Sequence, residues 1–338
     1  MIVPVFLPHL GCHTRCTYCN QQLITDVKDT DLGTVIGKTL NAHQGPYEVG
    51  LFAGNIFGIE PDQLRRLFAH FEGYRERIAN FRVSTKPVSM RNETLEILKA
   101  NRVTVIELGI PTFNDKVLSR LNRRHSAQDL ISSYETLVKQ GFRVALQFMV
   151  GLPGETMDDI RLTVQNMTGL KPHYIRIYPL VVFEGTRLGE MYKKGRFKPI
   201  SFDAALDRSV FIYLNAKKSE IPVVKMGLTE NEVIKEQILA GQYHPAYGYM
   251  VKARAFYLAM MAKLVAVPIK GSAMTVHLSA ADVAHLTGYK RTNVDRFEKE
   301  GIALQWEEKE VPEDNFILHY DGRSVPGNVL DAMEMFRD

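Results

Sequence analysis

The stretch "PHLGCHTRCTYCNQQ" at residues 8–22 contains all three cysteines of a 338-residue chain. The cysteines, Cys12, Cys16 and Cys19, follow the spacing Cys-x3-Cys-x2-Cys, and mostly polar residues separate them. Three thiols cannot pair into a disulfide framework without leaving one over. The spacing therefore indicates a site that uses thiolates as metal ligands.

Two simpler interpretations compete with an iron–sulfur cluster at this loop. Free cysteine is often a small buried hydrophobic residue, but that interpretation expects apolar neighbours. Structural zinc normally takes four protein ligands, and His13 is the one nearby candidate for the fourth. An iron–sulfur cluster takes thiolate ligands, and three cysteines on a four-iron cluster leave one iron open for chemistry.

The segment "CHTRCTYC" (12–19) resembles the cysteine loop of radical S-adenosylmethionine (radical SAM) enzymes, including the aromatic residue at Tyr18. The resemblance implies one 4Fe-4S cluster on Cys12, Cys16 and Cys19, whose open fourth iron binds the amino and carboxylate groups of S-adenosyl-L-methionine. It also implies that one electron from the reduced cluster cleaves a carbon–sulfur bond and yields a 5′-deoxyadenosyl radical. An electron donor such as flavodoxin or ferredoxin is the partner that this reaction needs.

Residues 1–200 alternate short β-rich runs with helical patterns, and each type of element occurs about six times. The strands are expected at 2–8, 47–54, 81–87, 103–111, 142–151 and 174–182. Helices are expected to start near Pro61, Asn92, Ser126 and Thr156. This alternation predicts an α/β fold with a parallel sheet and helices outside it, and the family's partial (β/α)6 barrel has the same architecture. Active sites in such barrels lie at the carboxyl ends of the strands, where the cysteine loop falls.

Over residues 1–200 the chain resembles most the radical SAM branch that holds the catalytic subunit of Elongator and the oxygen-independent coproporphyrinogen oxidases. The turn "FAGNIFG" (52–58) lies where that branch has a Gly-Gly-Thr turn for the methionine amino group. "NRRH" (122–125) lies where an arginine holds the methionine carboxylate by charge-assisted hydrogen bonds. The cofactor contacts that the resemblance implies are Tyr18, Gly54, Asn55, Ser84, Arg123, Gln147 and Leu180.

The chain departs from the branch at some of these positions. Pro111 replaces a glutamine usual in the fourth strand, so that polar contact is missing, while Gln147 occupies the position where a polar side chain meets the ribose. Each match also has a plainer explanation, because glycine and proline after strands are common turn residues. Arg123 alone could be a solvated helix end.

The alternation ends near residue 200, and we expect three parts: 1–200, a helical segment at 201–265, and a small α/β domain at 266–338. Residues 274–308 read strand, helix, tight turn, helix, strand, which resembles the core of a KH RNA-binding module. "GYKR" replaces the Gly-x-x-Gly loop of that module. The resemblance implies RNA contacts at Gly288, Lys290 and Arg291, whereas a basic turn that binds nothing is the alternative.

Composition excludes some functional classes. The net charge of +4 is compatible with an anionic partner but does not by itself indicate one. The apolar opening lacks a basic leader, and the most apolar later run contains Lys263, so we expect a cytoplasmic protein without membrane contact. With three cysteines we expect no auxiliary cluster, and with eleven residues before Cys12 we expect no cobalamin domain ahead of the barrel. We see no match to Elongator's acetyltransferase domain.

The sequence therefore predicts a radical SAM enzyme that cleaves S-adenosylmethionine reductively and starts hydrogen-atom abstraction on an unidentified substrate. RNA is one substrate class, and a small metabolite or a tetrapyrrole is the other. A non-catalytic iron–sulfur protein is a third hypothesis. Formation of 5′-deoxyadenosine separates the enzyme from the non-catalytic protein, and RNA binding separates the two substrate classes.

Overall fold

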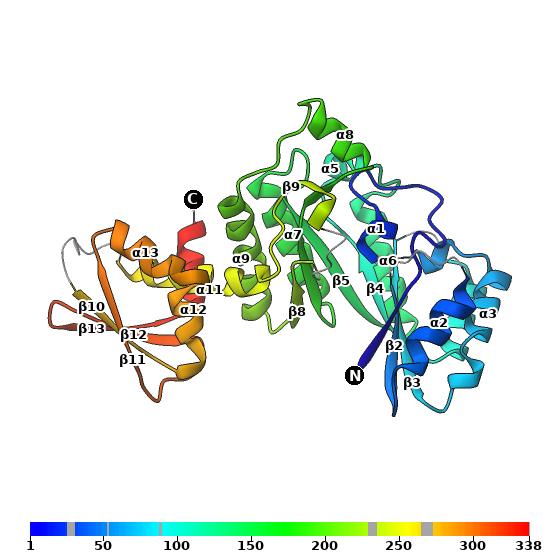
Figure 1. Ribbon diagram of the computed structural model, residues 1–338, viewed down its shortest axis with the longest axis horizontal. Helices are drawn as coiled ribbons and strands as arrows, with labels where there is room; N and C mark the ends of the chain where they lie inside the picture. The colour runs from blue at the N-terminus through cyan, green and yellow to red at the C-terminus, as the bar shows by residue number, and fades with distance from the viewer. Residues whose placement is uncertain (26–30, 53, 88–89, 229–234, 265–272, 338) are drawn as a thin grey trace. The chain divides into compact units, whose positions relative to one another are not determined.

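The computed structural model describes residues 1–25, 31–52, 54–87, 90–228, 235–264 and 273–337. The chain forms two compact units (Figure 1). Unit 1 comprises Met1–Ile200, Ile221–Val224 and Thr229–Gln242, and unit 2 comprises Ser201–Glu220, Lys225–Leu228 and Tyr243–Asp338. The division expected at residues 200 and 265 stays a prediction. Within the described ranges, no helix is long and apolar enough to cross a membrane.

Unit 1 contains the first six strands of a seven-stranded sheet, and these six are parallel neighbours in chain order. The strands of the sheet, in spatial order, are β1 (Ile2–Phe6), β2 (Tyr47–Phe52), β3 (Ile78–Thr85), β4 (Val103–Gly109), β5 (Arg143–Val150), β6 (Ile175–Pro179) and β8 (Val223–Met226). A separate antiparallel pair is formed by β7 (Val181–Phe183) and β9 (Ile238–Gly241). The predicted parallel half-barrel sheet is confirmed.

Helices alternate with the strands along the chain. They are α1 (Gln21–Thr25), α2 (Leu32–Asn41), α3 (Pro61–Ala69), α4 (Asn92–Ala100), α5 (Asp115–Arg120), α6 (Ala127–Lys139), α7 (Met157–Leu170) and α8 (Arg187–Lys193), with short 3-10 turns η1 (Ile56–Gly58) and η2 (Glu72–Tyr74). In Figure 1, α2 and α3 lie beside the sheet while α5 and α8 lie at its upper end. Ser126 and Thr156 begin α6 and α7 as capping boxes, as their sequence patterns predict. Asn92 is itself the first residue of α4, and its predecessor Arg91 makes no side-chain cap.

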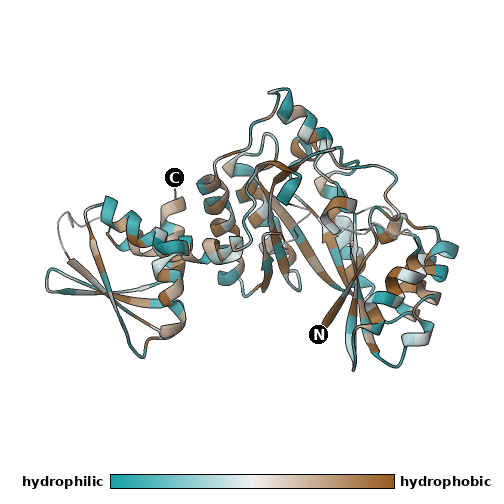
Figure 2. Cartoon of the chain, in the orientation of Figure 1, coloured by the Kyte–Doolittle hydropathy of each residue, from teal (hydrophilic) through white to brown (hydrophobic). Residues whose placement is uncertain are grey.

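The two faces of the sheet differ in polarity because side chains alternate along each strand. The face under the helices is apolar, with fully buried Val83, Ile106 and Phe148. The opposite, inner face carries polar side chains, including Arg82 and Glu107. Figure 2 shows the resulting brown and teal banding along the strands. The inner face is therefore the one suited to bind a polar ligand.

Unit 2 combines helices with a four-stranded mixed sheet in the order β11-β10-β12-β13. β10 is parallel to β11 and antiparallel to β12. Its elements are α9 (Phe202–Lys218), α11 (Tyr247–Leu264), β10 (Ala273–Leu278), η3 (Ala280–Asp282), α12 (Val283–Thr287), η4 (Tyr289–Arg291), α13 (Thr292–Lys299), β11 (Ala303–Glu308), β12 (Asn315–Tyr320), β13 (Arg323–Asn328) and η5 (Val329–Phe336). One apolar core joins the helices to the sheet, with Val251, Phe297 and Phe316 at its centre. The expected order strand, helix, turn, helix, strand over 274–308 is present.

Candidate active site

The cysteine loop starts directly after β1 and is tied to the end of β2. Leu7 N donates to Phe52 O at 2.8 Å, and Cys12 N donates to His9 O at 2.9 Å. Gly11 has a φ of 72°, and a Cβ there would lie 2.2 Å from Asn55 O. Only glycine fits this conformation at such a close approach. The loop is thus held at the carboxyl edge of the sheet.

The three thiols are free and influence one another. Cys16 is buried, whereas Cys12 and Cys19 are half-buried. Burial, together with the nearby Cys16 thiol, raises the pKa of Cys12 and raises that of Cys19 to about 12. The cations of Lys86 and Arg123 act in the opposite direction. A site that needs thiolates here therefore needs additional positive charge, which a bound metal supplies.

The thiols do not converge on one point: within the described part of the chain, no three Cys, His, Asp or Glu side chains form a site for a single metal ion. A four-iron cluster takes each thiolate on a different iron, so its ligands need not converge.

Arg123 connects the cysteine loop to the end of β4. Its Nη2 donates to the Tyr18 hydroxyl at 2.8 Å, and its Nη1 donates to Gly109 O at 3.2 Å. Burial raises the pKa of Tyr18, so this hydroxyl stays protonated beside the guanidinium. The structure thus brings two of the predicted cofactor residues, Tyr18 and Arg123, together next to the thiols.

Unsatisfied polar atoms lie around Arg123. Thr17 Oγ1, Arg123 Nε and His125 Nε2 are buried and have no hydrogen-bond partner among the residues that the structure describes. A buried polar atom without a partner is costly, and such atoms at a functional site indicate an absent ligand. Thr17 Oγ1 and Arg123 Nε each carry a hydrogen that can be donated to a carboxylate. These residues therefore fit the methionine end of S-adenosylmethionine.

The turn after β2 is joined to both the cysteine loop and β3. Asn55 is buried, its Nδ2 donates to Gly11 O at 3.0 Å, and its Oδ1 accepts from Thr85 Oγ1 and Lys86 N at 2.9 and 3.0 Å. A Cβ at Gly54 would lie 3.2 Å from Leu10 O, so this turn approaches the cysteine loop closely. Contacts of Gly54 and Asn55 with a cofactor stay predictions. Ala53, from the same quoted turn, lies outside the described residues.

The remaining predicted cofactor residues occupy different surroundings. Ser84 and Gln147 are half-buried on the inner face of the sheet, and Gln147 Nε2 donates to Glu107 Oε2 at 2.5 Å. Leu180 is fully buried in an apolar cluster that Tyr18 contacts. The N–H of Leu180 donates to Val150 O, and its carbonyl accepts from Gln242 N, so both backbone groups are already used.

Sequence reasoning missed two residues at this site. Lys86 Nζ donates to Thr14 O at 2.9 Å, and its positive charge acts to lower the pKa of the Cys12 thiol. His125 lies close enough to Arg123 for the cation to lower its pKa, after burial, to about 4. Lys86 lies in the strand expected at 81–87 and His125 in the quoted motif "NRRH", but only the fold places Lys86 beside the thiols and His125 beside Arg123.

Two family models match the chain, the Radical SAM superfamily over residues 6–167 and the Radical_SAM C-terminal domain over residues 172–256. The chain belongs to the radical SAM superfamily. The family and the enzyme class inferred from the cysteine loop are thereby confirmed, and members of this superfamily use a 4Fe-4S cluster and S-adenosylmethionine. The substrate does not follow from the family.

Curated relatives of this radical SAM chain cover part of it. An uncharacterized protein of Methanocaldococcus jannaschii is 32% identical over 58% of this chain and 61% of its own length. A tRNA uridine(34) acetyltransferase of the same organism is 27% identical over 44% of this chain and 28% of its own length. The heme chaperone HemW of Bacillus subtilis is 30% identical over 35% of this chain and 32% of its own length. The chain thus matches less than two thirds of each relative.

Solved structures show the same fold. The Elp3 protein of Methanocaldococcus infernus aligns with a TM-score of 0.55 at 20% identity, over 74% of this chain and 61% of that one. Coproporphyrinogen III oxidase of Escherichia coli aligns with a TM-score of 0.51 at 18% identity, over 64% of this chain and 52% of that one. At these identities, the two alignments show that the fold is shared.

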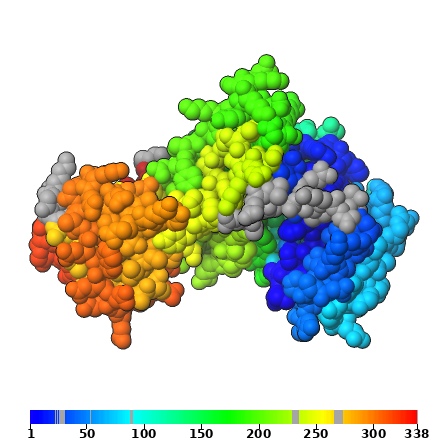
Figure 3. Space-filling model, viewed as in Figure 1, coloured from blue at the N-terminus to red at the C-terminus, as the bar shows by residue number. Residues whose placement is uncertain are grey.

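The "GYKR" segment of unit 2 forms an exposed, strained turn. Gly288 has a φ of 76°, and the non-glycine residues Lys290 and Arg291 also have positive φ, 50° and 65°. Lys290 and Arg291 are exposed, and Figure 3 shows the orange region that contains them at the surface of unit 2. Arg291 Cζ lies 5.9 Å from the centre of the Trp306 ring. RNA contacts at Gly288, Lys290 and Arg291 and the KH-like fold stay predictions.

Proposed function

We propose that this radical SAM enzyme holds one 4Fe-4S cluster on Cys12, Cys16 and Cys19 and cleaves S-adenosylmethionine reductively. The observation that carries the proposal is the set of three free thiols on one loop beside Arg123, with unpartnered buried polar atoms around them. The chain has no fourth cysteine, so one iron is left for the cofactor.

Each residue around the thiols has a role in this proposal. Arg123 binds the methionine carboxylate through its unpartnered Nε, while Tyr18 and Gly109 hold its other nitrogens in place. Lys86 donates to Thr14 O and places a positive charge near Cys12, and so stabilises the loop in its liganding conformation. When bound and reduced, the cluster supplies the electron that cleaves the cofactor. An external one-electron donor such as flavodoxin or ferredoxin reduces it.

Formation of 5′-deoxyadenosine tests this proposal. Protein reconstituted anaerobically with iron and sulfide is mixed with dithionite and S-adenosylmethionine, and 5′-deoxyadenosine is measured by chromatography. We expect formation by the wild-type chain and none by Cys16→Ala. A cluster without any 5′-deoxyadenosine would favour the non-catalytic iron–sulfur protein instead.

We propose RNA, and tRNA in particular, as the substrate class. Support comes from the relatives named as tRNA uridine(34) acetyltransferases and from the exposed basic turn at Lys290 and Arg291. RNA is bound largely through its phosphates, which an outward-facing Lys–Arg pair can contact. A gel mobility shift with total tRNA tests this class, and we expect a shift that added salt weakens.

A tetrapyrrole is the second candidate, because two relatives named as heme chaperone HemW also match the chain, at 30% and 28% identity. Titration with heme separates the two classes. A new Soret band at stoichiometric heme, with no tRNA shift, would favour the tetrapyrrole over RNA.

A further inference from the structure

Glu107 of β4 is the centre of a buried polar network on the inner face of the sheet. It is fully buried, and donors from three neighbouring segments surround its carboxylate. Gln147 Nε2 donates to its Oε2 at 2.5 Å, while Tyr174 OH and Arg176 Nη2 donate to its Oε1 at 2.6 and 2.8 Å. Arg82 Nη1 lies 3.5 Å from the same Oε1. All of these partners donate, which suits a carboxylate that only accepts.

This network determines which end of the Gln147 amide faces Glu107. With the amide turned over, Gln147 Oε1 would face Glu107 Oε2, and two acceptors would meet without a proton between them. The NH2 group must therefore face Glu107, and the carbonyl oxygen Oε1 must face the other way. Glu107 thus makes Gln147 an acceptor toward whatever lies beside it.

The position of Gln147 connects this network to the site at Arg123. Gln147 is the register partner of Gly109, whose carbonyl accepts from Arg123 Nη1. Ser84, another predicted cofactor residue, is the register partner of Glu107. Gln147 therefore lies at the level of the strand ends where Arg123 is fixed.

We propose that Glu107 is a positioning residue for cofactor binding: it orients the amide of Gln147 so that its carbonyl oxygen accepts a hydrogen bond from a ribose hydroxyl of S-adenosylmethionine. This inference rests on the proposed function, because it takes the cofactor to bind beside Arg123. Glu107 itself is buried among protein donors and acts only through Gln147.

Exchanging the side chains of Glu107 and Gln147 tests whether Glu107 orients the amide at position 147. In Glu107→Gln, the new amide keeps its oxygen toward Tyr174 and Arg176, because both are donors. Its NH2 group then faces Gln147, whose amide must turn over and present a donor to the ribose. In the double variant Glu107→Gln/Gln147→Glu, the carboxylate at 147 accepts from the new NH2 group and again presents an acceptor.

The experiment measures binding of S-adenosylhomocysteine and of its 2′-fluoro-2′-deoxy and 3′-fluoro-3′-deoxy analogues to anaerobically reconstituted protein by calorimetry. Fluorine cannot donate a hydrogen bond, so an acceptor at Gln147 disfavours it where a hydroxyl is bound. We expect wild type to prefer the hydroxyl over fluorine by roughly 3- to 10-fold at one of the two positions. Glu107→Gln should reduce this preference to about twofold or less, and the swapped double variant should restore it.

Thermal melts and cluster content show whether each variant folds, and the swapped variant keeps the test valid if Glu107→Gln alone is unstable. A folded Glu107→Gln that keeps the wild-type preference would overturn the positioning role, as would a swapped variant that does not regain it. Wild type that binds S-adenosylhomocysteine without any hydroxyl preference would also overturn it, while leaving the proposed function intact. No binding of S-adenosylhomocysteine by any form would instead contradict the proposed function.

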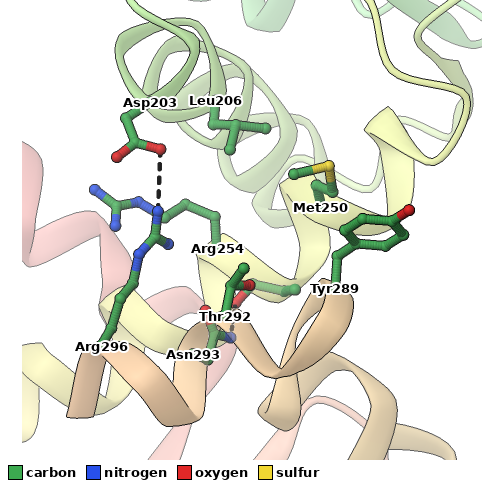
Figure 4. A pocket seen from close by; sticks show the side chains of 9 residues that line it. Asp203, Leu206, Met250, Arg254, Tyr289, Thr292, Asn293 and Arg296 are labelled. Carbon is green, nitrogen blue, oxygen red and sulfur yellow. Dashed lines mark hydrogen bonds and ion pairs between the residues drawn. The ribbon is translucent and has the colours of Figure 1, made fainter. Parts of the chain in front are cut away.

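A cavity of about 140 Å³ lies within unit 2 (Figure 4). Its two arginines, Arg254 and Arg296, are each paired with an aspartate, Asp207 and Asp203. The cavity therefore has no uncompensated charge that would identify a ligand.

Discussion

At the scale of single residues, the site depends on side chains whose partners are far away in sequence. Arg123 reaches Tyr18 across 105 positions, and Lys86 reaches Thr14 across 72. Asn55 uses its amide to join the cysteine loop to the end of β3. Among the described residues, these contacts leave Thr17 Oγ1, Arg123 Nε and His125 Nε2 buried without a hydrogen-bond partner beside the cysteine loop.

Replacing Arg123 with alanine should weaken binding of S-adenosylmethionine and leave the cluster in place. A hydrogen bond to a charged group contributes roughly 1.5–3 kcal/mol, so the affinity should fall on the order of ten- to a hundredfold. Equilibrium dialysis measures the affinity, and absorbance of the reconstituted protein measures the cluster. The neighbouring, exposed Arg124 gives the matched control, Arg124→Ala. Equal affinities in the two variants would mean that the "NRRH" motif is assigned wrongly.

His125 should make the stability of the cluster-free protein depend on pH. Burial, followed by the Arg123 cation, lowers its pKa to about 4, whereas the unfolded chain takes up this proton near pH 6.5. Stability is therefore fully present above about pH 6.5 and is lost as pH falls toward about 4. We expect a loss on the order of 2 kcal/mol over this range, after a discount for partial exposure.

Urea unfolding at several pH values measures this loss. His125→Gln should show a smaller decrease over the same pH range, because glutamine does not titrate. The same pH dependence in both proteins would show that other groups cause it.

At the scale of elements, local signals set where helices begin and where the chain turns. Ser126 and Thr156 each accept from the backbone three residues on, and the aspartate at that position bonds back. Such reciprocal caps are readable in sequence, because both partners lie within one helical turn. The turn at 288–291 is different, since two consecutive non-glycine residues there have positive φ.

Replacing Arg291 with glycine should stabilise unit 2. A left-handed conformation costs a non-glycine residue roughly 1–2 kcal/mol, and glycine removes that cost while losing some entropy on folding. We expect a net gain of about 0.5–1 kcal/mol in the free energy of unfolding. Arg291→Ala is the control, because it also loses the contact with Trp306 but keeps the strain. A glycine variant no more stable than the alanine variant would contradict a strained backbone at Arg291.

At the scale of the whole molecule, the chain joins a half-barrel unit that carries the thiols to a unit with an exposed basic turn. Binding of an RNA by the second unit and chemistry in the first would be separable functions. Because the cysteine site lies in unit 1, changes to the basic turn should not affect cofactor cleavage.

The double variant Lys290→Ala/Arg291→Ala should therefore bind tRNA with a weaker salt dependence. Each phosphate that a cation neutralises contributes about 0.7 to the slope of log affinity against log salt for a single strand. Removing both contacts should lower the slope by about 1–1.5. Unstimulated 5′-deoxyadenosine formation should stay at the wild-type rate.

Lys193→Ala/Lys194→Ala, an exposed basic pair in unit 1, gives the matched control and should keep the wild-type slope. An equal loss of slope in both double variants would mean that RNA binds through general positive charge.

The sequence by itself determined the cysteine loop, the six strands and the main helix starts of unit 1. These features depend on spacing within a few residues or on the period of apolar positions, so they are visible without the fold. The family followed from the same local signals. Even the placement of the loop at the carboxyl edge follows from strand–helix alternation, because parallel strands end at a common edge.

Only the tertiary structure decided which side chains meet at that edge. Glu107 contacts Gln147 across 40 positions and Tyr174 across 67, and nothing in the local pattern marks a glutamate in a buried strand as their common acceptor. The pairing depends on the register of β4 and β5 and on which face each strand turns inward. Register is set by burial of the opposite apolar face against the helices, since a slip of one residue would exchange the two faces. The orientation of Gln147 is therefore a consequence of packing across the whole sheet.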